Sequence, residues 1–200
     1  MNFLAHFYLS APEKHLIVGG FLGDFVKGPL RGDFESGLES GIRLHRHIDT
    51  LTDSHPAQKS IKQCLPDNFY RYSGIIADMM CDHFLSKHWH RFHETALETF
   101  SADCIGLVKN QQAKLIGTAS DVLERMDEGD WLLHYRDLNY ICGAISRIGT
   151  RLRYANPLGE IQKLMPSLSQ QIEPDCLKIL NDTRGAVTKW RSIHLAETVL

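Results

Sequence analysis

The sequence predicts an all-α fold, a single-domain helical bundle, and three observations support that class. Apolar residues recur three and four positions apart over long stretches, as amphipathic helices require. The 200 residues contain no convincing alternation of β-branched residues and no Asn-Gly or Asp-Gly hairpin turn. The composition, 43% hydrophobic and 23% charged, is that of an ordinary globular domain. We therefore expect roughly seven to nine helices with short connections.

The first half of the chain predicts four helices. The apolar stretch 16–26 is expected to end at Gly28-Pro29, and its glycines would let a neighbouring helix approach closely. Residues 28–32 are expected to form a loop and residues 36–51 the next helix. A short helix follows, with Pro56 near its first position. The strongest amphipathic pattern opens at Pro66-Asp67 and runs to about residue 89.

The second half predicts further helices separated by turn residues. Asn156-Pro157 and Pro166 are expected to interrupt the chain before the final pair of helices. The expected helices cover residues 101–116, 121–126, 138–152, 167–180 and 184–195.

The net charge restricts the class of partner, and the cysteines indicate the cellular compartment. A formal net charge of -2 gives no reason to expect nucleic acid. The first residues lack the basic and apolar regions of a signal peptide, and no stretch approaches the roughly 20 apolar residues that span a bilayer. Five scattered cysteines, without a Cys-x-x-Cys pair, predict reduced thiols in a cytoplasmic protein.

Histidine is the unusual residue of this chain. Nine of the 11 histidines lie at or before His93. Imidazole can both ligate metals and move protons, so we expect the functional site in the first half. His6 is interpreted as a core histidine whose ring nitrogens find hydrogen-bond partners within the protein.

Two expected helices carry ligand-type side chains at helical spacing. His45 and Asp49 are four residues apart, and so are Asp78 and Asp82, with His83 next to them. Residues at this spacing share a helix face. Imidazole and carboxylate together suit Mn, Fe, Zn or Mg in mixed oxygen–nitrogen sites. The alternative for His45 and Asp49 is an exposed helix pair without a ligand.

Three carboxylates lie among apolar neighbours. Asp78 and Asp82 sit in the strongest amphipathic helix, and Asp24 lies between Gly23 and Phe25. A carboxylate is rarely buried without a partner, because removing an unpaired charge from water is costly. A bound cation would serve as that partner. A basic residue would serve equally, such as Lys27 for Asp24 or an arginine of another helix for the aspartates of 66–89.

The absent motifs narrow the chemistry. The sequence contains no GxGxxG, P-loop, GxSxG or CxxC pattern, which argues against a nucleotide-fold enzyme and an α/β-hydrolase. A helical hydrolase with His and Asp ligands is most naturally a phosphoesterase. Its metal would polarise a phosphoryl oxygen and lower the pKa of a bound water towards roughly 7.

A local excess of positive charge follows in the second half. Residues 136–153 contain four arginines against Asp137 alone, a local charge of +3. This stretch predicts either a dock for an acidic partner or a solvated helix face.

Five short segments in order resemble the bacterial acyl carrier protein phosphodiesterases, a divergent group of the HD phosphohydrolases. The resemblance extends from the first residue to about residue 153. The segments are Met1 to His6, Gly23 to Gly28, His45 to Asp49 with Leu51 to Asp53, Asp82 to Trp89, and Tyr135 to Asp137.

The resemblance implies an HD-domain-like helical enzyme that depends on a divalent metal, with manganese favoured. Such an enzyme hydrolyses the phosphodiester that joins 4'-phosphopantetheine to the serine of holo-acyl carrier protein. The length predicts one domain that spans 1–200, with the metal-site core in about 1–100 and C-terminal helices in about 101–200. The HD order of an adjacent His-Asp pair is reversed here, as Asp82-His83.

Site residues follow from the same resemblance, position by position. His83 or His88 is expected to protonate the departing serine oxygen. The holo-carrier is the expected partner, with no role for nucleic acid or membrane. The expected metal ligands are Asp24, His45, Asp49, Asp78 and Asp82. The expected substrate-binding residues are Lys27, Arg46, Arg136, Arg147 and Arg151.

Two other functions remain open at this point. An HD-like phosphohydrolase could use the same metal site on a nucleotide or another small phosphodiester. A non-catalytic helical protein could have kept the carrier dock and lost the metal.

Overall fold

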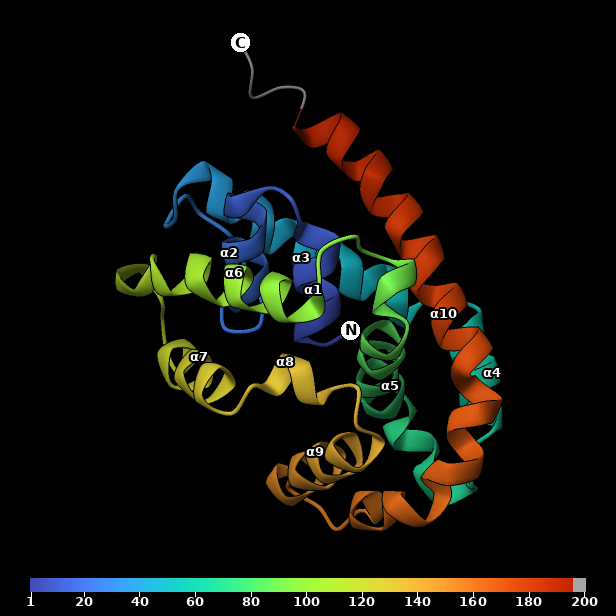
Figure 1. The fold of residues 1–200 in the computed structure, drawn as a ribbon. Coiled ribbons are helices and arrows are strands. Elements are labelled where there is room, and N and C mark those ends of the chain that lie inside the picture. The colour runs from blue at the N-terminus through green and yellow to red at the C-terminus, as the bar shows by residue number, and fades with distance from the viewer. Residues whose placement is uncertain (196–200) are drawn as a thin grey trace.

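The computed structural model describes residues 1–195, and throughout that part of the chain the regular structure is helical, without a strand. Figure 1 shows the helices gathered into a bundle, with the long C-terminal helix along one side. This confirms the all-α prediction. The α-helices are α1 (Phe3–Ser10), α2 (Lys14–Leu22), α3 (Ser36–Asp53), α4 (Ala57–Gln63), α5 (Ser73–Lys87), α6 (Leu97–Lys109), α7 (Ala119–Glu128), α8 (Trp131–His134), α9 (Leu138–Arg151) and α10 (Ile161–His194). Short 3-10 turns are η1 (Asp67–Tyr72), η2 (Trp89–Arg91), η3 (Gln112–Lys114) and η4 (Pro157–Glu160).

Glycines let α2 and α3 pack against each other at very short range. A Cβ added at Gly41 of α3 would lie 2.7 Å from the Cα of Gly19 in α2, closer than real Cβ atoms approach. A Cβ at Gly19 would likewise overlap the carbonyl of Leu38. The close approach predicted for the glycines of 16–26 is confirmed, and it brings the face of α3 that carries His45 against the end of α2.

The N-terminal helix α1 was not predicted. Seven of its eight residues, from Leu4 to Ser10, are buried, and it packs against α2, α3 and α5. A helix buried on every side shows no amphipathic period, because apolar residues cover its whole circumference. For the same reason the sequence did not indicate that α1 packs against α3 and α5, the helices that carry the expected ligands.

The helix predicted over 66–89 is divided in the structure. Residues 67–72 form η1, and the α-helix α5 begins only at Ser73. Phe69 is buried at the centre of η1, so the apolar spacing that suggested one helix continues through a tighter turn. Helix α5 contacts α1, α4, α9 and α10 and is buried for most of its length.

The break predicted at Pro166 is wrong, because α10 runs unbroken for 34 residues through both Pro166 and Pro174. Proline removes one backbone hydrogen bond and usually kinks or ends a helix. Here buried residues continue along the inner face on either side of both prolines, among them Met165, Leu168, Ile172 and Cys176. Tertiary packing against α5, α4 and α9 therefore maintains the helix where local propensity would end it.

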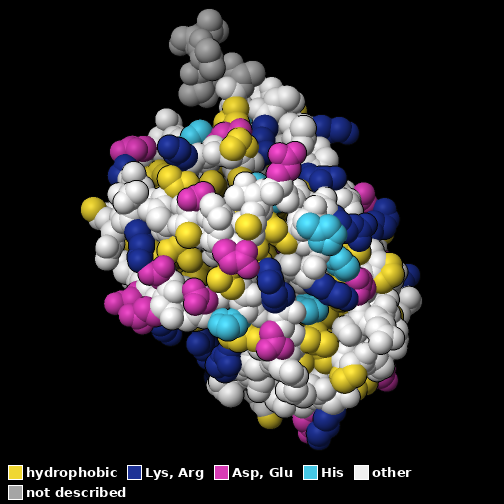
Figure 2. All heavy atoms as spheres, in the orientation of Figure 1, with side chains coloured by type: hydrophobic (Ala, Val, Ile, Leu, Met, Phe, Trp, Pro, Cys, Tyr) yellow, Lys and Arg dark blue, Asp and Glu magenta, His cyan; other side chains and the backbone are white. Residues whose placement is uncertain are grey.

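The mixed surface charge and the free cysteines agree with the small net charge and the scattered cysteines of the sequence. Figure 2 shows acidic and basic side chains interspersed over the visible face, without one dominant sign. All five cysteines are free, and four of them are buried. Among the described helices, none is long and apolar enough to cross a membrane.

Candidate metal centre

Three side chains from two helices converge at the centre of the N-terminal half. His6 of α1 and His45 and Asp49 of α3 each offer a ligand atom, and these atoms lie within 4.8 Å of one another. His6 Nε2 lies 3.1 Å from Asp49 Oδ1, and His45 Nε2 lies 3.2 Å from Asp49 Oδ2. The two imidazole rings are stacked with centroids 3.9 Å apart. We call these three residues the His6–His45–Asp49 cluster.

Helix α3 supplies two members of the cluster through its own period. His45 and Asp49 are four residues apart, so both point toward α1 from one face of α3. His45 is buried, whereas the Asp49 side chain keeps 40% of its surface exposed. The cluster is therefore a half-open site whose imidazoles are inside and whose carboxylate reaches solvent.

Asp24 lies at the edge of this cluster. It sits in the turn that follows α2, with Oδ1 4.0 Å from His45 Nε2 and 43% of its side chain exposed. Arg46, next to His45 on α3, donates a hydrogen bond of 3.0 Å to the carbonyl of Val26 and so ties this turn to α3. Asp24 is thus held near His45 by the backbone that surrounds it.

Gly23 makes room for the His45 ring. A Cβ added at Gly23 would overlap the Cγ, Cβ and Cδ2 atoms of His45. Gly23→Ala is expected to displace the His45 ring, to lower the free energy of unfolding by about 1–3 kcal/mol through overpacking and to reduce divalent-metal affinity by tenfold or more. Chemical unfolding and metal titration measure the two effects. Gly106→Ala is the matched control, because a Cβ there meets nothing within 4 Å, and a variant at Gly23 with unchanged metal affinity would contradict the expected role.

The cluster favours a neutral imidazole beside a charged carboxylate. Burial lowers the pKa of His6 to about 3, and His45 acts in the same direction, against the opposing effect of Asp49. Burial disfavours ionisation of Asp49, but hydrogen bonds from His45 and His6 outweigh it and hold the pKa of this carboxyl well below its usual range. A neutral imidazole and an ionised carboxylate are the protonation states that bind a cation.

Acid is therefore expected to destabilise the metal-free protein through His6. The unfolded chain binds a proton at His6 below about pH 6.5, whereas the folded chain does not until about pH 3. The free energy of unfolding should fall on acidification within that window, by about 1.4 kcal/mol per pH unit from this group alone. Urea titrations of the chelated protein from pH 7 to pH 5 measure it. The wild-type slope should exceed that of His6→Gln, while exposed His90→Gln should keep the wild-type slope; equal slopes for His6→Gln would refute this.

Asp78 is linked to the cluster because Asp78 and Asp49 both contact the amino group of Met1. The amino group of Met1 lies 3.1 Å from Asp78 Oδ1 and 3.5 Å from Asp49 Oδ1. Burial disfavours the charge on this amine, yet Asp78 and Asp49 outweigh burial and raise its pKa to about 10. The ammonium group therefore joins α5 to α3 beside the two imidazoles.

Asp82 binds the backbone at the start of α1. Its side chain is fully buried and accepts hydrogen bonds from three backbone N–H groups at the start of α1, those of Asn2, Leu4 and Ala5, at 2.8–3.3 Å. Burial raises the pKa of this carboxyl to about 7, against the effect of the amine and of these donors. The first N–H groups of a helix have no partner within the helix, and Asn2 provides no side-chain cap. Asp82 thus caps α1 from α5 and does not join the cluster.

The two histidines expected to be catalytic also have other partners. His83 is buried and its Nδ1 lies 2.9 Å from the carbonyl of Tyr135, which joins α5 to the chain after α8. His88 pairs with Glu173 of α10, which also accepts from Lys87. The described contacts of both rings lead away from the His6–His45–Asp49 cluster.

The basic residues fall into three places. Lys27 is exposed beyond the turn that carries Asp24, and Arg46 binds that turn. Arg136 lies 3.5 Å from Glu98 of α6. Arg147 and Arg151 are exposed on α9 and line a cavity beside the start of α1.

The donor set suits a divalent cation. Two imidazole nitrogens and a carboxylate oxygen face one another, with the Asp24 carboxylate nearby, a mixed set that Mn, Fe and Zn accept. The Nδ1 atoms of His6 and His45 have no hydrogen-bond partner within the described residues, so no second protein group fixes these rings. A cation on the Nε2 side would orient both rings at once.

Sequence reasoning missed His6. The sequence predicts a core histidine, and His6 is indeed buried, but its ring stacks on His45 and contacts Asp49. No local spacing could reveal this, because His6 and Asp49 are 43 residues apart. Two signals were available: the crowding of histidines in the first half, and the place of His6 in the first of the segments that carry the family resemblance.

The family model described as acyl carrier protein phosphodiesterase matches residues 1–183. A relative of that name from Pectobacterium atrosepticum is 32% identical over 159 residues, which cover 76% of this chain and 79% of the relative. Relatives of the same name from Photorhabdus laumondii and Escherichia coli are 28% and 29% identical, with 76% of this chain covered in each case and 77% and 79% of the relative. No solved structure matches the chain.

Proposed function

Because this chain belongs to the acyl carrier protein phosphodiesterase family, we propose that it hydrolyses holo-acyl carrier protein to apo-acyl carrier protein and 4'-phosphopantetheine. The observation that carries the proposal beyond the family name is the convergence of His6, His45 and Asp49 within 4.8 Å. A phosphodiesterase must stabilise the charge that develops on the phosphoryl oxygens, and a metal ion can do so. The cluster is suited to hold such an ion.

We propose Mn²⁺ as the resident ion, with His6 Nε2, His45 Nε2 and Asp49 as ligands and Asp24 at the open side. When bound, such an ion polarises the phosphoryl oxygens and lowers the pKa of water. Asp24 is 43% exposed and adjoins the cluster, so it can bind at the edge where substrate enters. Lys27 lies beyond the same turn and can attract the carrier's acidic surface.

The reaction breaks the bond between phosphorus and the serine oxygen of the carrier. Water adds its hydroxyl to phosphorus, and the serine oxygen leaves with a proton. We propose supporting roles for Asp82 and His83, which hold α1 and the chain after α8, and for Asp78, which holds the amine of Met1 next to Asp49. His88 is proposed to stabilise the contact with α10 through Glu173. The free cysteines favour a cytoplasmic location.

Mass spectrometry of holo-carrier tests the proposal. Incubation with the protein and Mn²⁺ should remove the phosphopantetheine mass from the carrier, and chelation should prevent it. Asp24→Ala should slow this loss while leaving helical content unchanged. Unchanged holo-carrier in the presence of metal would refute the proposed reaction.

Two comparisons separate the other functions. A small aryl phosphodiester that is hydrolysed faster than holo-carrier, at both low and high salt, would favour a small-substrate phosphohydrolase. A protein that binds the carrier but neither binds nor responds to divalent cations would favour a non-catalytic role.

A further inference from the structure

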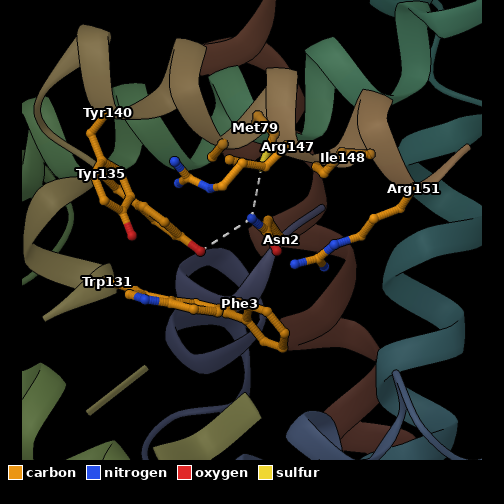
Figure 3. Close-up of a pocket in the computed structure, with 10 residues that line it drawn as sticks. Asn2, Phe3, Met79, Trp131, Tyr135, Tyr140, Arg147, Ile148 and Arg151 are labelled. Carbon is orange, nitrogen blue, oxygen red and sulfur yellow. Dashed lines mark hydrogen bonds between the residues drawn. The ribbon is translucent and has the colours of Figure 1, made fainter. Parts of the chain in front are cut away.

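A cavity opens between the start of α1 and helices α5, α8 and α9. Its volume is about 160 Å³, and Asn2, Phe3, Met79, Trp131, Tyr135 and residues of α9 line it (Figure 3). Met1, whose amine lies 3.5 Å from Asp49 Oδ1, immediately precedes the lining residue Asn2. The chain that lines the cavity at Asn2 therefore continues directly into the Met1 amine that contacts Asp49 of the His6–His45–Asp49 cluster.

The size of the cavity restricts its occupant to a narrow group. A cavity of about 150 Å³ holds one benzene molecule. A helix of a partner protein, about 10–12 Å across with its side chains, cannot enter this space. A short section of a flexible chain of small cross-section can.

The lining suits a chain that contains amides. Figure 3 shows Trp131 and Phe3 on one side of the cavity, with Asn2 and Tyr135 joined by a hydrogen bond beside them. Asn2 Nδ2 donates to the Tyr135 hydroxyl at 3.2 Å and contacts Met79 Sδ at 2.9 Å, and no hydrogen bond among the described residues uses Asn2 Oδ1.

One acceptor and one donor are therefore available in an aromatic setting. Asn2 Oδ1 can accept a hydrogen bond, and the Tyr135 hydroxyl, which accepts from Asn2, retains its own proton to donate. Burial raises the pKa of Tyr135 well above its ordinary value, so the hydroxyl stays protonated. An amide presents one donor and one acceptor, which matches this pair.

Two arginines complete the rim. Arg147 and Arg151 are exposed on α9, one turn apart, and both line the cavity. The Arg147 guanidinium lies 5.6 Å from the centre of the Tyr140 ring, which holds its charge near the opening. The cavity thus offers an aromatic interior and one hydrogen-bond acceptor and one donor that match an amide. Its two arginines form a cationic edge suited to a phosphate or an acidic surface.

We propose that this cavity binds one amide-containing section of the pantetheine arm of the substrate, between Trp131 and Tyr135, with the phosphate toward the His6–His45–Asp49 cluster and the rest of the arm outside the cavity. The proposal rests on the proposed function and adds that the arm itself is recognised. Recognition of the arm lets the protein distinguish a loaded carrier from an apo-carrier of the same surface.

Filling the cavity tests the proposal. Ala144 lines it from α9, and Ala144→Phe should raise KM for holo-carrier at least tenfold while hydrolysis of bis(4-nitrophenyl) phosphate changes less than twofold. Thr150→Phe, at an exposed position of the same helix outside the cavity, should leave both substrates within twofold of wild type. An unchanged KM for holo-carrier in Ala144→Phe would overturn the assignment.

Tyr135→Phe provides a second variant that removes a single oxygen, in case the larger side chain prevents folding. It should raise KM for holo-carrier several-fold and leave the small phosphodiester unaffected. Equal effects on the two substrates would indicate a merely structural role and count against the cavity.

Free pantetheine separates this proposal from the proposed reaction. Saturation-transfer NMR should detect pantetheine bound to the wild-type protein and not to Ala144→Phe. Binding without carrier hydrolysis would support the cavity and refute the reaction. Carrier hydrolysis with no pantetheine binding and no effect of Ala144→Phe would refute the cavity and leave the reaction intact.

Discussion

Asp49→Ala is expected to lower hydrolysis of holo-carrier by more than about 100-fold and to abolish tight divalent-metal binding. Loss of groups that only support a metal ligand already costs 10–100-fold in affinity or activity, so loss of a ligand should exceed that range. Asp49 contacts both imidazoles, and its two oxygens face His6 and His45 separately. Its removal also takes one of two carboxylates from the buried amine of Met1.

The measurement pairs turnover with metal titration and circular dichroism. Asp53→Ala is the matched control, because Asp53 is an exposed carboxylate one turn further along α3. Helical content should be unchanged in both variants, and only Asp49→Ala should lose metal and activity. Full activity in a folded Asp49→Ala protein would remove the His6–His45–Asp49 cluster from the mechanism.

Asp82→Ala is expected to damage the fold instead of the chemistry. Three backbone N–H groups of α1 would lose their acceptor, and a buried donor without a partner costs roughly 1–3 kcal/mol. Relief from burying a carboxyl whose pKa is raised to about 7 offsets part of that cost. The net loss should be about 2 kcal/mol, which lowers Tm by about 4–8 °C in a chain of this size.

Calorimetry and hydrogen exchange check this expectation. Exchange should accelerate first at the amides of α1, and metal affinity should fall because His6 lies on that helix. Asp24→Ala is the contrasting variant, since Asp24 is partly exposed and caps no helix in the described structure, and it should reduce activity with little change in Tm. An Asp82→Ala protein with wild-type Tm and no metal binding would instead return Asp82 to the ligand set.

The helical class and two of the three residues of the candidate site could be predicted from the sequence because both depend on local spacing. The bounds expected for 36–51 and 138–152 lie within two residues of α3 and α9. His45 and Asp49 share a face because the α-helical period places them there whatever the rest of the chain does. The glycines of α2 likewise indicated a close helix contact before any partner was known.

Local spacing also misled where burial outweighed it. Breaks were predicted at Pro166 and between residues 180 and 184, yet packing against α5 and α4 maintains a single α10. Asp78 and Asp82 share a face of α5 as expected, but one binds an amine beside the cluster and the other caps α1. Their apolar neighbours predicted burial with a partner without indicating which partner, and Asp82 is fully buried whereas Asp78 is partly buried.

By itself the sequence determined the all-α class, most of the helices between residues 14 and 151 and the face of α3 that carries His45 and Asp49, since hydrogen bonding and side-chain direction within a helix are local. Only the tertiary structure decided that His6 meets His45 and Asp49, and that Asp82 faces the start of α1. Those contacts join residues 43 and about 80 positions apart. They depend on how whole helices pack, which is set by shape and buried area over many residues and not by any short pattern.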